Sequence, residues 1–310
     1  MPRRLLLVVN PAAGGGRAAR LLPGVRSALE AAGHDLRTCP TRSLAHADEL
    51  ADEGVADGRV VVAMGGDGLV GRVAGRVADA GGLLAVLPGG RGNDFARALG
   101  LARSAEGACA VLEHGRERRI DLGCLTSAAG TAGFLGIASV GFDSEVQERT
   151  LRSRLPLGQL VYLYAALATV AGWRPAGFTA HVDGERVDVE GWTFAVANSG
   201  VYGGGMRLAP DASVEDGLLD VVTVSTTSRL RFVRSLPGVF RGTHVRRPSV
   251  AVRRAVRVEL DADRPFRVFA DGDPLAVLPC TLTVRPGALR VLLPVPPTPR
   301  PAAATAGPGA

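Results

Sequence analysis

A loop of small residues and one acid, Gly65-Gly66-Asp67-Gly68, has a composition suited to holding an anion. It follows an apolar run, Val60 to Met64, and precedes a helix-like pattern that begins at Leu69. Glycines let the backbone approach a phosphate and point its N–H groups toward it, and the helix that follows adds its positive end. Asp67 lies beside this anion site. An acid in such a place usually orients hydrogen-bond donors or binds a cation. The alternative is a tight strand-to-helix turn with Asp67 as a capping residue.

Two further glycine loops also follow apolar runs: Asn10-Pro11-Ala12-Ala13-Gly14 and Pro88-Gly89-Gly90-Arg91-Gly92-Asn93-Asp94. Arg91 could grip a phosphate with its forked guanidinium. Asn93 could reach a sugar or phosphate, or it could simply cap the helix that follows. Ligands of parallel sheets bind at the carboxyl ends of the strands, and all three loops are expected there. The sequence therefore predicts one site, built from three loops, that could hold a polyphosphate.

Two acidic turns in the second half of the chain could add carboxylates to such a site. Asp271 and Asp273 lie two residues apart across a turn, where one could accept a hydroxyl proton and the other hold a magnesium-bound water. The alternative for them is a plain β-turn. The loop Pro210–Asp220 contains four acids and could hold a hard cation with carboxylates and carbonyls, or it could be a solvated turn.

The elements that must position these loops differ between the two halves. Strand, glycine loop and helix recur three times before residue 100, which predicts a parallel sheet with helices on both faces. After about residue 120 short strands dominate, with hairpin signals at Asp183-Gly184 and Asp271-Gly272. The short strands expected there include 186–189, 193–197, 281–285 and 289–293, each as a separate strand. The only helices expected there are 157–172 and 229–240.

We therefore expect an α/β nucleotide-binding domain over residues 1–120 and an antiparallel β-sandwich substrate domain over residues 121–293. The last strands of the second domain are candidates to return to the first. The Pro/Ala/Gly-rich tail over 294–310 is expected to be disordered. The apolar helix 157–172 is either buried in its domain, or lines a lipid pocket or rests on a membrane.

Composition excludes several classes of site. The 310 residues are 46% hydrophobic and 21% charged, as in globular proteins, and no run of 18 apolar residues predicts a membrane span. The opening apolar run is too short for a secretory signal. Four scattered cysteines and five scattered histidines give little support for disulfides or a zinc site. The chain has no lysine, so Schiff-base chemistry and a P-loop lysine are excluded.

The net charge of +6 is concentrated in one window. Residues 221–258 contain no acid, and nine arginines lie between Arg229 and Arg257. Such a run predicts a face for an anionic membrane surface, or else a solvated face of an arginine-rich protein. Nucleic acid is not expected as a partner, because Phe232 and Phe240 are the only aromatic residues available for stacking in this window.

In this order the motifs resemble the diacylglycerol kinase catalytic family, bacterial lipid kinases related to sphingosine and ceramide kinases. The matching motifs are Asn10-Pro11-x-x-Gly14, Gly65-Gly66-Asp67-Gly68, Pro88-x-Gly90-x-x-Asn93-Asp94-Phe95-Ala96-Arg97, Asp121-Leu122-Gly123, Gly141-Phe142-Asp143, Pro210-Asp211-Ala212, Asp216-Gly217-Leu218-Leu219-Asp220 and Asp271-Gly272. They span nearly the whole chain. The resemblance implies an α/β nucleotide domain and a β-sandwich, with the active site in the cleft between them.

The resemblance also implies roles for individual residues. The expected ATP contacts are Asn10, Pro11, Ala12, Ala13, Gly14, Thr41, Gly65, Gly66, Asp67, Gly68, Leu69, Arg72, Arg91, Asn93 and Asp94. A magnesium ion is expected at Asp216, with the carbonyls of Ser213 and Leu218. Asp67 and Asp121 are expected near the catalytic magnesium, together with Asp271. Asp273 stands where the family has its proton-accepting glutamate.

Four departures from the family pattern touch the expected site. Leu69 and Arg91 stand where the family has threonines, and Gly71-Arg72 stands where it has Asn-Glu. Asp273 is one methylene shorter than the family's glutamate. Two hydroxyl donors are therefore missing, although Arg91 could replace one with a charge-assisted contact.

The function expected is ATP-dependent phosphorylation of a lipid hydroxyl, with diacylglycerol as substrate and phosphatidic acid as product. The alternatives are a NAD kinase-like phosphotransferase and a catalytically weak, nucleotide-binding lipid sensor. The expected location is the cytoplasm, at the inner face of the membrane, and a homodimer is left open.

Overall fold

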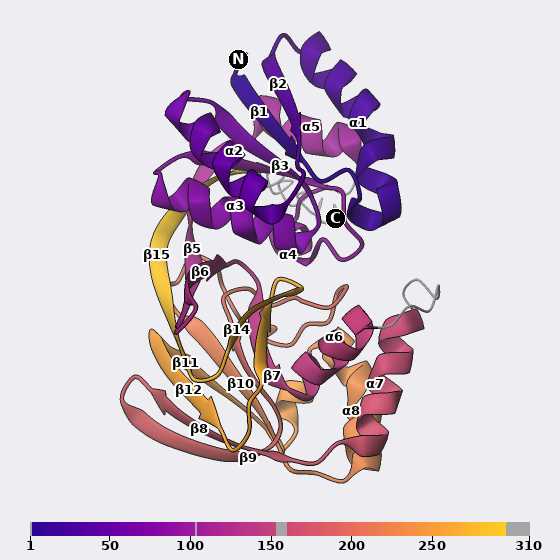
Figure 1. Cartoon of the computed structure of the whole chain (residues 1–310), viewed down its shortest axis with the longest axis vertical. Helices are drawn as coiled ribbons and strands as arrows, with labels where there is room; N and C mark the ends of the chain where they lie inside the picture. Colours follow the sequence, from indigo (N-terminus) through magenta and orange to yellow (C-terminus); the bar gives the residue numbers. More distant parts are fainter. Residues whose placement is uncertain (1, 103, 153–159, 296–310) are drawn as a thin grey trace, which may run out of the picture.

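The computed structural model describes residues 2–102, 104–152 and 160–295, which form two lobes stacked along the long axis (Figure 1). The first lobe contains four parallel strands in the order β2, β1, β3, β4. Their bounds are β1 (Arg4–Val9), β2 (Asp35–Pro40), β3 (Val60–Gly65) and β4 (Leu83–Pro88). The helices of this lobe are α1 (Ala13–Ala31), α2 (Leu44–Ala56), α3 (Asp67–Asp79), α4 (Asp94–Ala98) and α5 (Ala105–His114). Helix α2 packs beside α3 and α1 beside α5.

The second lobe consists of antiparallel strands with three helices on one side of them (Figure 1). The strands are β5 (Arg116–Ser127), β6 (Gly130–Phe134), β7 (Ile137–Gly141), β8 (Ala176–Val182), β9 (Glu185–Ala197), β10 (Leu219–Ser225), β11 (Val250–Ala255), β12 (Arg257–Ala262), β13 (Arg267–Ala270) and β14 (Asp273–Val277). The helices are α6 (Phe142–Arg152), α7 (Leu160–Gly172) and α8 (Arg229–Arg241), and a short 3-10 helix, η1, covers Thr243–Arg246.

One long strand, β15 (Cys280–Leu293), joins the two lobes (Figure 1). It pairs antiparallel with β12 and β5 in the second lobe. Its last part pairs in parallel with β4 of the first lobe, with Arg290 opposite Leu83. The strands of both lobes are therefore hydrogen-bonded into one mixed sheet.

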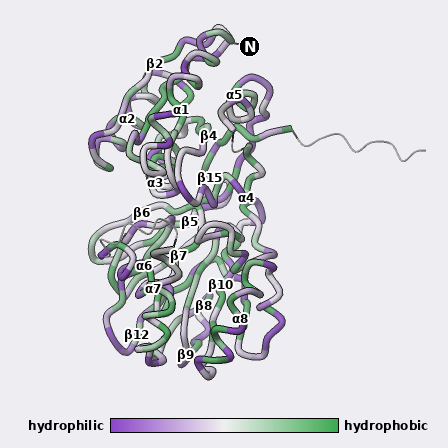
Figure 2. Tube along the Cα trace, turned by 90° about the vertical axis from the view of Figure 1, so that its right-hand side faces the viewer, coloured by the Kyte–Doolittle hydropathy of each residue, from purple (hydrophilic) through white to green (hydrophobic). Residues whose placement is uncertain are grey.

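Each lobe has its own apolar interior, seen as hydrophobic strands inside both halves in Figure 2. The core of the first lobe is aliphatic and includes Leu5 to Val9. The core of the second lobe contains an aromatic cluster, in which the rings of Trp192 and Phe232 stack with centroids 3.8 Å apart and Phe142 packs edge-on to both. Among the described residues no helix is long and apolar enough to cross a membrane.

The expected α/β lobe and antiparallel β-sandwich lobe are both confirmed. Both hairpin predictions are also correct: Asp183 and Asp271 have φ of 48° and 52°, and the glycine after each has φ near 90°. Positive φ at both central residues is the geometry that an Asp-Gly hairpin turn requires.

Three predictions of secondary structure were wrong. The segment Phe142–Arg152 is a helix that was not expected, and so is α5. The short strands expected at 186–189 and 193–197, and at 281–285 and 289–293, are parts of two long strands, β9 and β15. Glu190 and Gly191 continue the pairing of β9 with β8, whereas β15 continues past an irregularity at which its register with β5 shifts between Arg285 and Leu289. Residues 157–159 of the expected apolar helix and residues 296–310 of the expected tail lie outside the described part of the chain.

Candidate active site

The three glycine loops of the first lobe meet at the carboxyl ends of its strands, as the sequence predicted. A Cβ at Gly14, where φ is 63°, would lie 2.6 Å from the carbonyl oxygen of Gly89. A Cβ at Gly90 would overlap the Cα of Gly66. Only glycine permits backbones to approach so closely. The loops therefore form one continuous backbone surface beside the start of α3.

Asn93 maintains the shape of the third loop. Its side-chain oxygen accepts a hydrogen bond from the Gly90 N–H at 2.8 Å, and its side-chain amide donates to the Gly90 carbonyl at 2.9 Å. The residue is buried and has φ of 50°. Asn93 occupies the cap position of α4 but makes no side-chain capping bond, because both of its polar groups are used on Gly90. Of the two alternatives for Asn93, side-chain capping of the helix is therefore excluded.

The other expected nucleotide contacts differ in how accessible they are. Asn10 accepts a hydrogen bond from the Ala12 N–H at 3.1 Å and shapes the first loop. Arg91 is exposed on the third loop and lines the cleft. Leu69, at 4% exposure, packs its side chain against Gly65 in the core, so only its backbone N–H is available to an anion. Thr41 follows β2, and its N–H donates to the Val9 carbonyl at 2.7 Å.

The Asp-Gly hairpin between β13 and β14 packs directly on the first turns of α3. A Cβ at Gly68 would overlap the carboxylate of Asp273, and a Cβ at Gly71 would overlap that of Asp271. Gly68 and Gly71 are three residues apart and so share one face of the helix. The glycine at position 71, a departure from the family pattern, thus makes room for Asp271.

Asp271 is held from the opposite side by the loop between β6 and β7. Its two carboxylate oxygens accept hydrogen bonds from the N–H groups of Leu135 at 2.8 Å and Gly136 at 2.7 Å. Burial raises the pKa of Asp271 to about 7, with further contributions from the charges of Asp67 and Asp273. Burial also raises the pKa of Asp273, while the nearby charge of Arg72 lowers it. Arg72 itself is held by Asp48 of α2 at 2.5–3.1 Å.

Two more acids complete this group at the start of α3 and α4. Burial raises the pKa of Asp67 to about 6, with a further contribution from the charge of Asp94. Asp67 accepts a hydrogen bond from the Phe95 N–H at 3.1 Å, and Asp94 accepts one from the Gly204 N–H of the second lobe at 2.8 Å. The second oxygen of Asp94 is buried without a hydrogen-bond partner. Carboxylates that raise one another's pKa would be stabilised by a cation.

Asp121 is engaged elsewhere. Its buried carboxylate accepts hydrogen bonds from the N–H groups of Gly217 at 2.7 Å and Gly287 at 2.8 Å. It thereby anchors the acidic loop on β5 and β15. A role for Asp121 near a catalytic magnesium continues to rest on the family resemblance alone.

The acidic loop itself is shaped by local hydrogen bonds. Ser213 accepts one from the Glu215 N–H at 3.2 Å, and Asp216 accepts one from the Leu218 N–H at 3.1 Å. The guanidinium of Arg254 lies 4.0 Å from Asp216 and 3.7 Å from Asp220. Within the described residues, no cluster of three or more His, Cys, Asp or Glu side chains is arranged to hold a metal ion. A magnesium site here or in the cleft would therefore also need carbonyl, water or phosphate oxygens, which are ordinary magnesium ligands.

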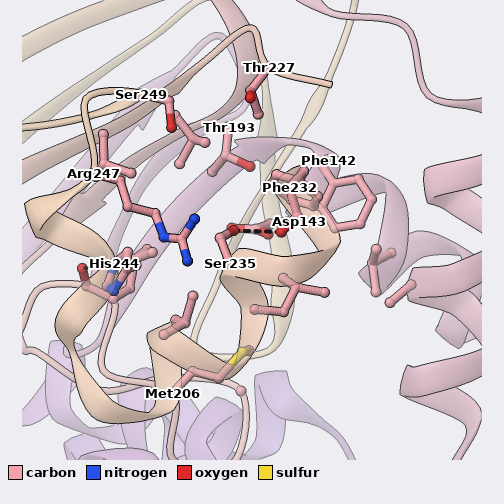
Figure 3. A pocket seen from close by; sticks show the side chains of 18 of the residues that line it. Phe142, Asp143, Thr193, Met206, Thr227, Phe232, Ser235, His244, Arg247 and Ser249 are labelled. Atoms are coloured by element: carbon pink, nitrogen blue, oxygen red, sulfur yellow. Dashed lines mark hydrogen bonds between the residues drawn. The ribbon is translucent and has the colours of Figure 1, made fainter. Parts of the chain in front are cut away.

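Two adjoining cavities extend from these carboxylates. A cleft of about 390 Å³ lies between the lobes, and its lining includes the charged residues Asp67, Arg91, Asp94 and Asp271. A largely apolar pocket of about 520 Å³ lies in the second lobe, between α6, α8 and the sheet (Figure 3). The residues that line both cavities are Gln147, Tyr202, Gly203 and Phe240. An apolar chamber therefore adjoins a cleft rich in carboxylates.

Comparisons with known proteins agree with this geometry. Residues 4–125 match the diacylglycerol kinase catalytic domain, and residues 136–293 match the YegS C-terminal NAD kinase beta sandwich-like domain. The chain is 34% identical to a diacylglycerol kinase of Mycobacterium tuberculosis, over 94% of this chain and 95% of that protein. The chain belongs to the diacylglycerol kinase catalytic family. As a member of this family of lipid kinases, it is a phosphotransferase.

Other members of the diacylglycerol kinase family are similar over most of their length. A Pseudomonas fluorescens protein named "Probable lipid kinase YegS-like" is 35% identical, over 87% of this chain and 90% of that one. A solved structure from Bacillus anthracis has a TM-score of 0.77 at 22% identity and covers 94% of this chain and 95% of that one. The structural likeness independently supports the fold.

Several residues around this diacylglycerol kinase-family site were not predicted. The N–H groups of Leu135 and Gly136 hold Asp271, and the N–H of Gly204 holds Asp94. Backbone donors carry no side-chain signal, so the sequence could not reveal them. Asp143 was noted only within a motif, and Tyr202 was not noted at all, although the two side chains form a hydrogen bond on the pocket wall.

Proposed function

We propose that this protein uses ATP to phosphorylate the hydroxyl group of a lipid, with diacylglycerol as the reference substrate. The observation that carries the proposal is the apolar pocket that opens into the cleft beside Asp271. An apolar pocket accommodates acyl chains, and a neighbouring polar cleft accommodates a hydroxyl and a polyphosphate. The names of several relatives, which include diacylglycerol kinase and lipid kinase, support this choice of substrate class.

The glycine loops and Arg91 would bind the polyphosphate of ATP. The loops present a continuous backbone surface, and α3 begins at Asp67 with its first N–H groups unused by the helix. Arg91 lies beside this surface: its guanidinium would be 3.8 Å from a Cβ at Gly15. Phosphoryl transfer depends mainly on positioning and charge stabilisation, which this arrangement supplies.

Asp273 would accept the proton of the lipid hydroxyl. Its burial raises its pKa, and a carboxylate of raised pKa is a better proton acceptor near neutral pH. Asp271 would keep the turn in place through its hydrogen bonds to Leu135 and Gly136. The hairpin thus places the carboxylate of Asp273 against Gly68 of the glycine loop and uses Asp271 to hold its position.

The carboxylates of Asp67 and Asp271 line the cleft, and the charge of Asp67 raises the pKa of Asp271, so a magnesium ion bound there would stabilise both. When bound, magnesium would supply positive charge to the phosphates. These acids would hold the ion together with phosphate or water oxygens.

A membrane is proposed as the surface from which the lipid enters. Four apolar side chains of the second lobe, Tyr164 and Leu167 of α7 and Leu230 and Phe240 of α8, are each more than half exposed. Among the described residues, several arginines in and after α8 form no ion pair: Arg231, Arg234, Arg241, Arg246 and Arg247. Apolar residues with arginines favour an anionic bilayer surface.

The experiment is a kinase assay of the natural chain and of Asp273→Asn with ATP, magnesium and diacylglycerol. A general base contributes about 10²–10⁴-fold, so D273N should lose that much turnover while its affinity for ATP stays unchanged. Asp188→Asn, an exposed acid on β9, is the matched control and should leave turnover unchanged. Phosphorylation of NAD instead of lipid would point to a NAD kinase-like enzyme. ATP binding without phosphorylation of any lipid would point to a sensor.

A further inference from the structure

One acid of the pocket, Asp143, has no role in the chemistry described above. It lies in the first turn of α6 and lines the apolar pocket (Figure 3). The hydroxyl of Tyr202 donates a hydrogen bond to its Oδ2 atom at 3.0 Å. Tyr202 lines both the pocket and the cleft. This pair of side chains therefore marks the junction between the apolar chamber and the carboxylate cleft.

No ion pair of Asp143 is found in the part of the chain that the structure describes, although Arg231 and Arg247 line the same pocket. Its neighbour Phe142 is packed among Trp173, Trp192 and Phe232, and burial raises the pKa of Asp143 to about 6. A carboxylate in such surroundings costs free energy unless it is paired. Tyr202 supplies one hydrogen bond, and a carboxylate can accept several.

We propose that Asp143 and Tyr202 form a polar subsite for a hydrogen-bond-donating group of the lipid, next to the hydroxyl that is phosphorylated. The donor would be an ammonium group or a second hydroxyl. The subsite lies at the junction, where the polar part of a lipid must pass if its chains occupy the pocket and its acceptor hydroxyl reaches the cleft. The inference rests on the proposed function and narrows its substrate class from diacylglycerol, whose groups beside the hydroxyl are esters, to lipids with a second hydrogen-bond donor.

The direction of the hydrogen bonds decides which chemistry fits. The carboxylate of Asp143 only accepts, and the Tyr202 oxygen has already donated its proton, so both groups offer acceptors to a ligand. An ester carbonyl is also an acceptor, so it would form no hydrogen bond with Asp143 or Tyr202. An amino-alcohol or a diol supplies a donor at this position. The subsite therefore favours such lipids over an alcohol that has no second donor.

The test is a binding titration with three probes of equal chain length: dodecan-1-ol, dodecane-1,2-diol and 2-aminododecan-1-ol. The chain's two tryptophans, Trp173 and Trp192, lie with ring centroids 5.8 and 5.5 Å from that of Phe142. Intrinsic fluorescence should therefore report a ligand beside Asp143. No ATP is present, so the measurement does not depend on catalysis.

The natural chain should bind the diol and the amino-alcohol at least about tenfold more tightly than the simple alcohol, because a hydrogen bond to a charged group is strong. Asp143→Asn should reduce the preference for the amino-alcohol to about threefold or less. Tyr202→Phe, which keeps the ring, should weaken the binding of the diol. Asp188→Asn changes the charge equally at an exposed site and should retain every preference.

Equal binding of the three probes by the natural chain would overturn the subsite, and so would an unchanged preference in D143N that keeps a native circular dichroism spectrum. Asp273→Asn separates this inference from the proposed function. If D273N and the natural chain both prefer donors but neither phosphorylates a lipid, the proposed function fails while the subsite stands.

Discussion

The carboxylate of Asp273 lies against the Cα of Gly68, so that a Cβ at position 68 would displace this carboxylate. The two residues come from different lobes, one from the hairpin of the second and one from the glycine loop of the first. Their contact fixes the distance between the proposed proton acceptor and the proposed phosphate loop.

Gly68→Ala should therefore displace the Asp273 carboxylate. A displacement of about 1 Å can cost about 100-fold in rate, so we expect a loss of that order in kcat with the fold retained. Gly24→Ala is the matched control, because a Cβ at Gly24 meets no atom within 4 Å. Steady-state kinetics and thermal unfolding would measure both variants. Full activity in G68A would show that the hairpin position does not control turnover.

Two substitutions at Asn93 separate the effects of its hydrogen bonds and of its positive φ on the stability of the fold. Asn93→Gly keeps the positive φ accessible but removes two buried hydrogen bonds, whereas Asn93→Ala removes the bonds and strains the backbone as well. N93G should lose about 1–3 kcal/mol of unfolding free energy, and N93A about 1 kcal/mol more. Denaturant unfolding would measure the difference. If N93A were as stable as N93G, the positive φ would carry no strain.

The raised pKa of Asp67 predicts a stability that changes with pH. Between pH 4 and about 6 the folded chain binds a proton on Asp67 that the unfolded chain has released, so stability falls as pH rises through this window. Asp67→Asn removes this penalty and should stabilise the protein at pH 8, by no more than about 3 kcal/mol. It should also lower kinase activity. Asp188→Asn, whose carboxylate has a pKa lowered by Arg186, should give no stabilisation.

The arginine window divides into two groups that predict different effects on membrane binding. Arg231 and Arg234 of α8 form no ion pair among the described residues, whereas Arg253 pairs with Glu185 at 3.0 Å and Arg257 with Glu259 at 2.8 Å. Arg231→Gln with Arg234→Gln should weaken binding to anionic vesicles by about 30-fold, at about 1 kcal/mol per arginine. Arg253→Gln with Arg257→Gln is the control of equal charge.

Sedimentation with anionic and neutral vesicles, at low and high salt, would measure this effect. Salt should weaken the binding of the natural chain, because it screens charges at a surface. Equal losses in the two double variants would show that total charge, rather than the α8 face, directs the protein to lipid.

Much of this architecture could be predicted because its signals are local. The apolar runs before each glycine loop and the Asp-Gly hairpins specify their own geometry, and both were found. The helix α6 was missed, although its Glu148–Arg152 pair has the i,i+4 spacing of a helix. Helix formation there also depends on Phe142 packing into an aromatic cluster assembled from distant segments.

In the candidate site, too, local motifs could be predicted and contacts between distant segments could not. The acids that line the cleft, Asp67, Asp94 and Asp271, were named from their motifs, but their contacts were not. Leu69 was expected beside a nucleotide and proves to be buried against Gly65, because the first turn of α3 directs that side chain inward. The subsite of Asp143 and Tyr202 joins two segments far apart in sequence, and no spacing rule connects them.

The parallel pairing of β15 with β4 has a consequence for how the chain is made. The first lobe emerges first from the ribosome, yet its sheet lacks its last neighbour until almost the whole chain has been synthesised. Until β15 is synthesised, the edge of β4 is unpaired, and an unpaired strand edge can pair with strands of other chains. The first lobe expressed alone should therefore aggregate. Refolding of the whole chain should be limited by the long-range step that pairs β15 with β4.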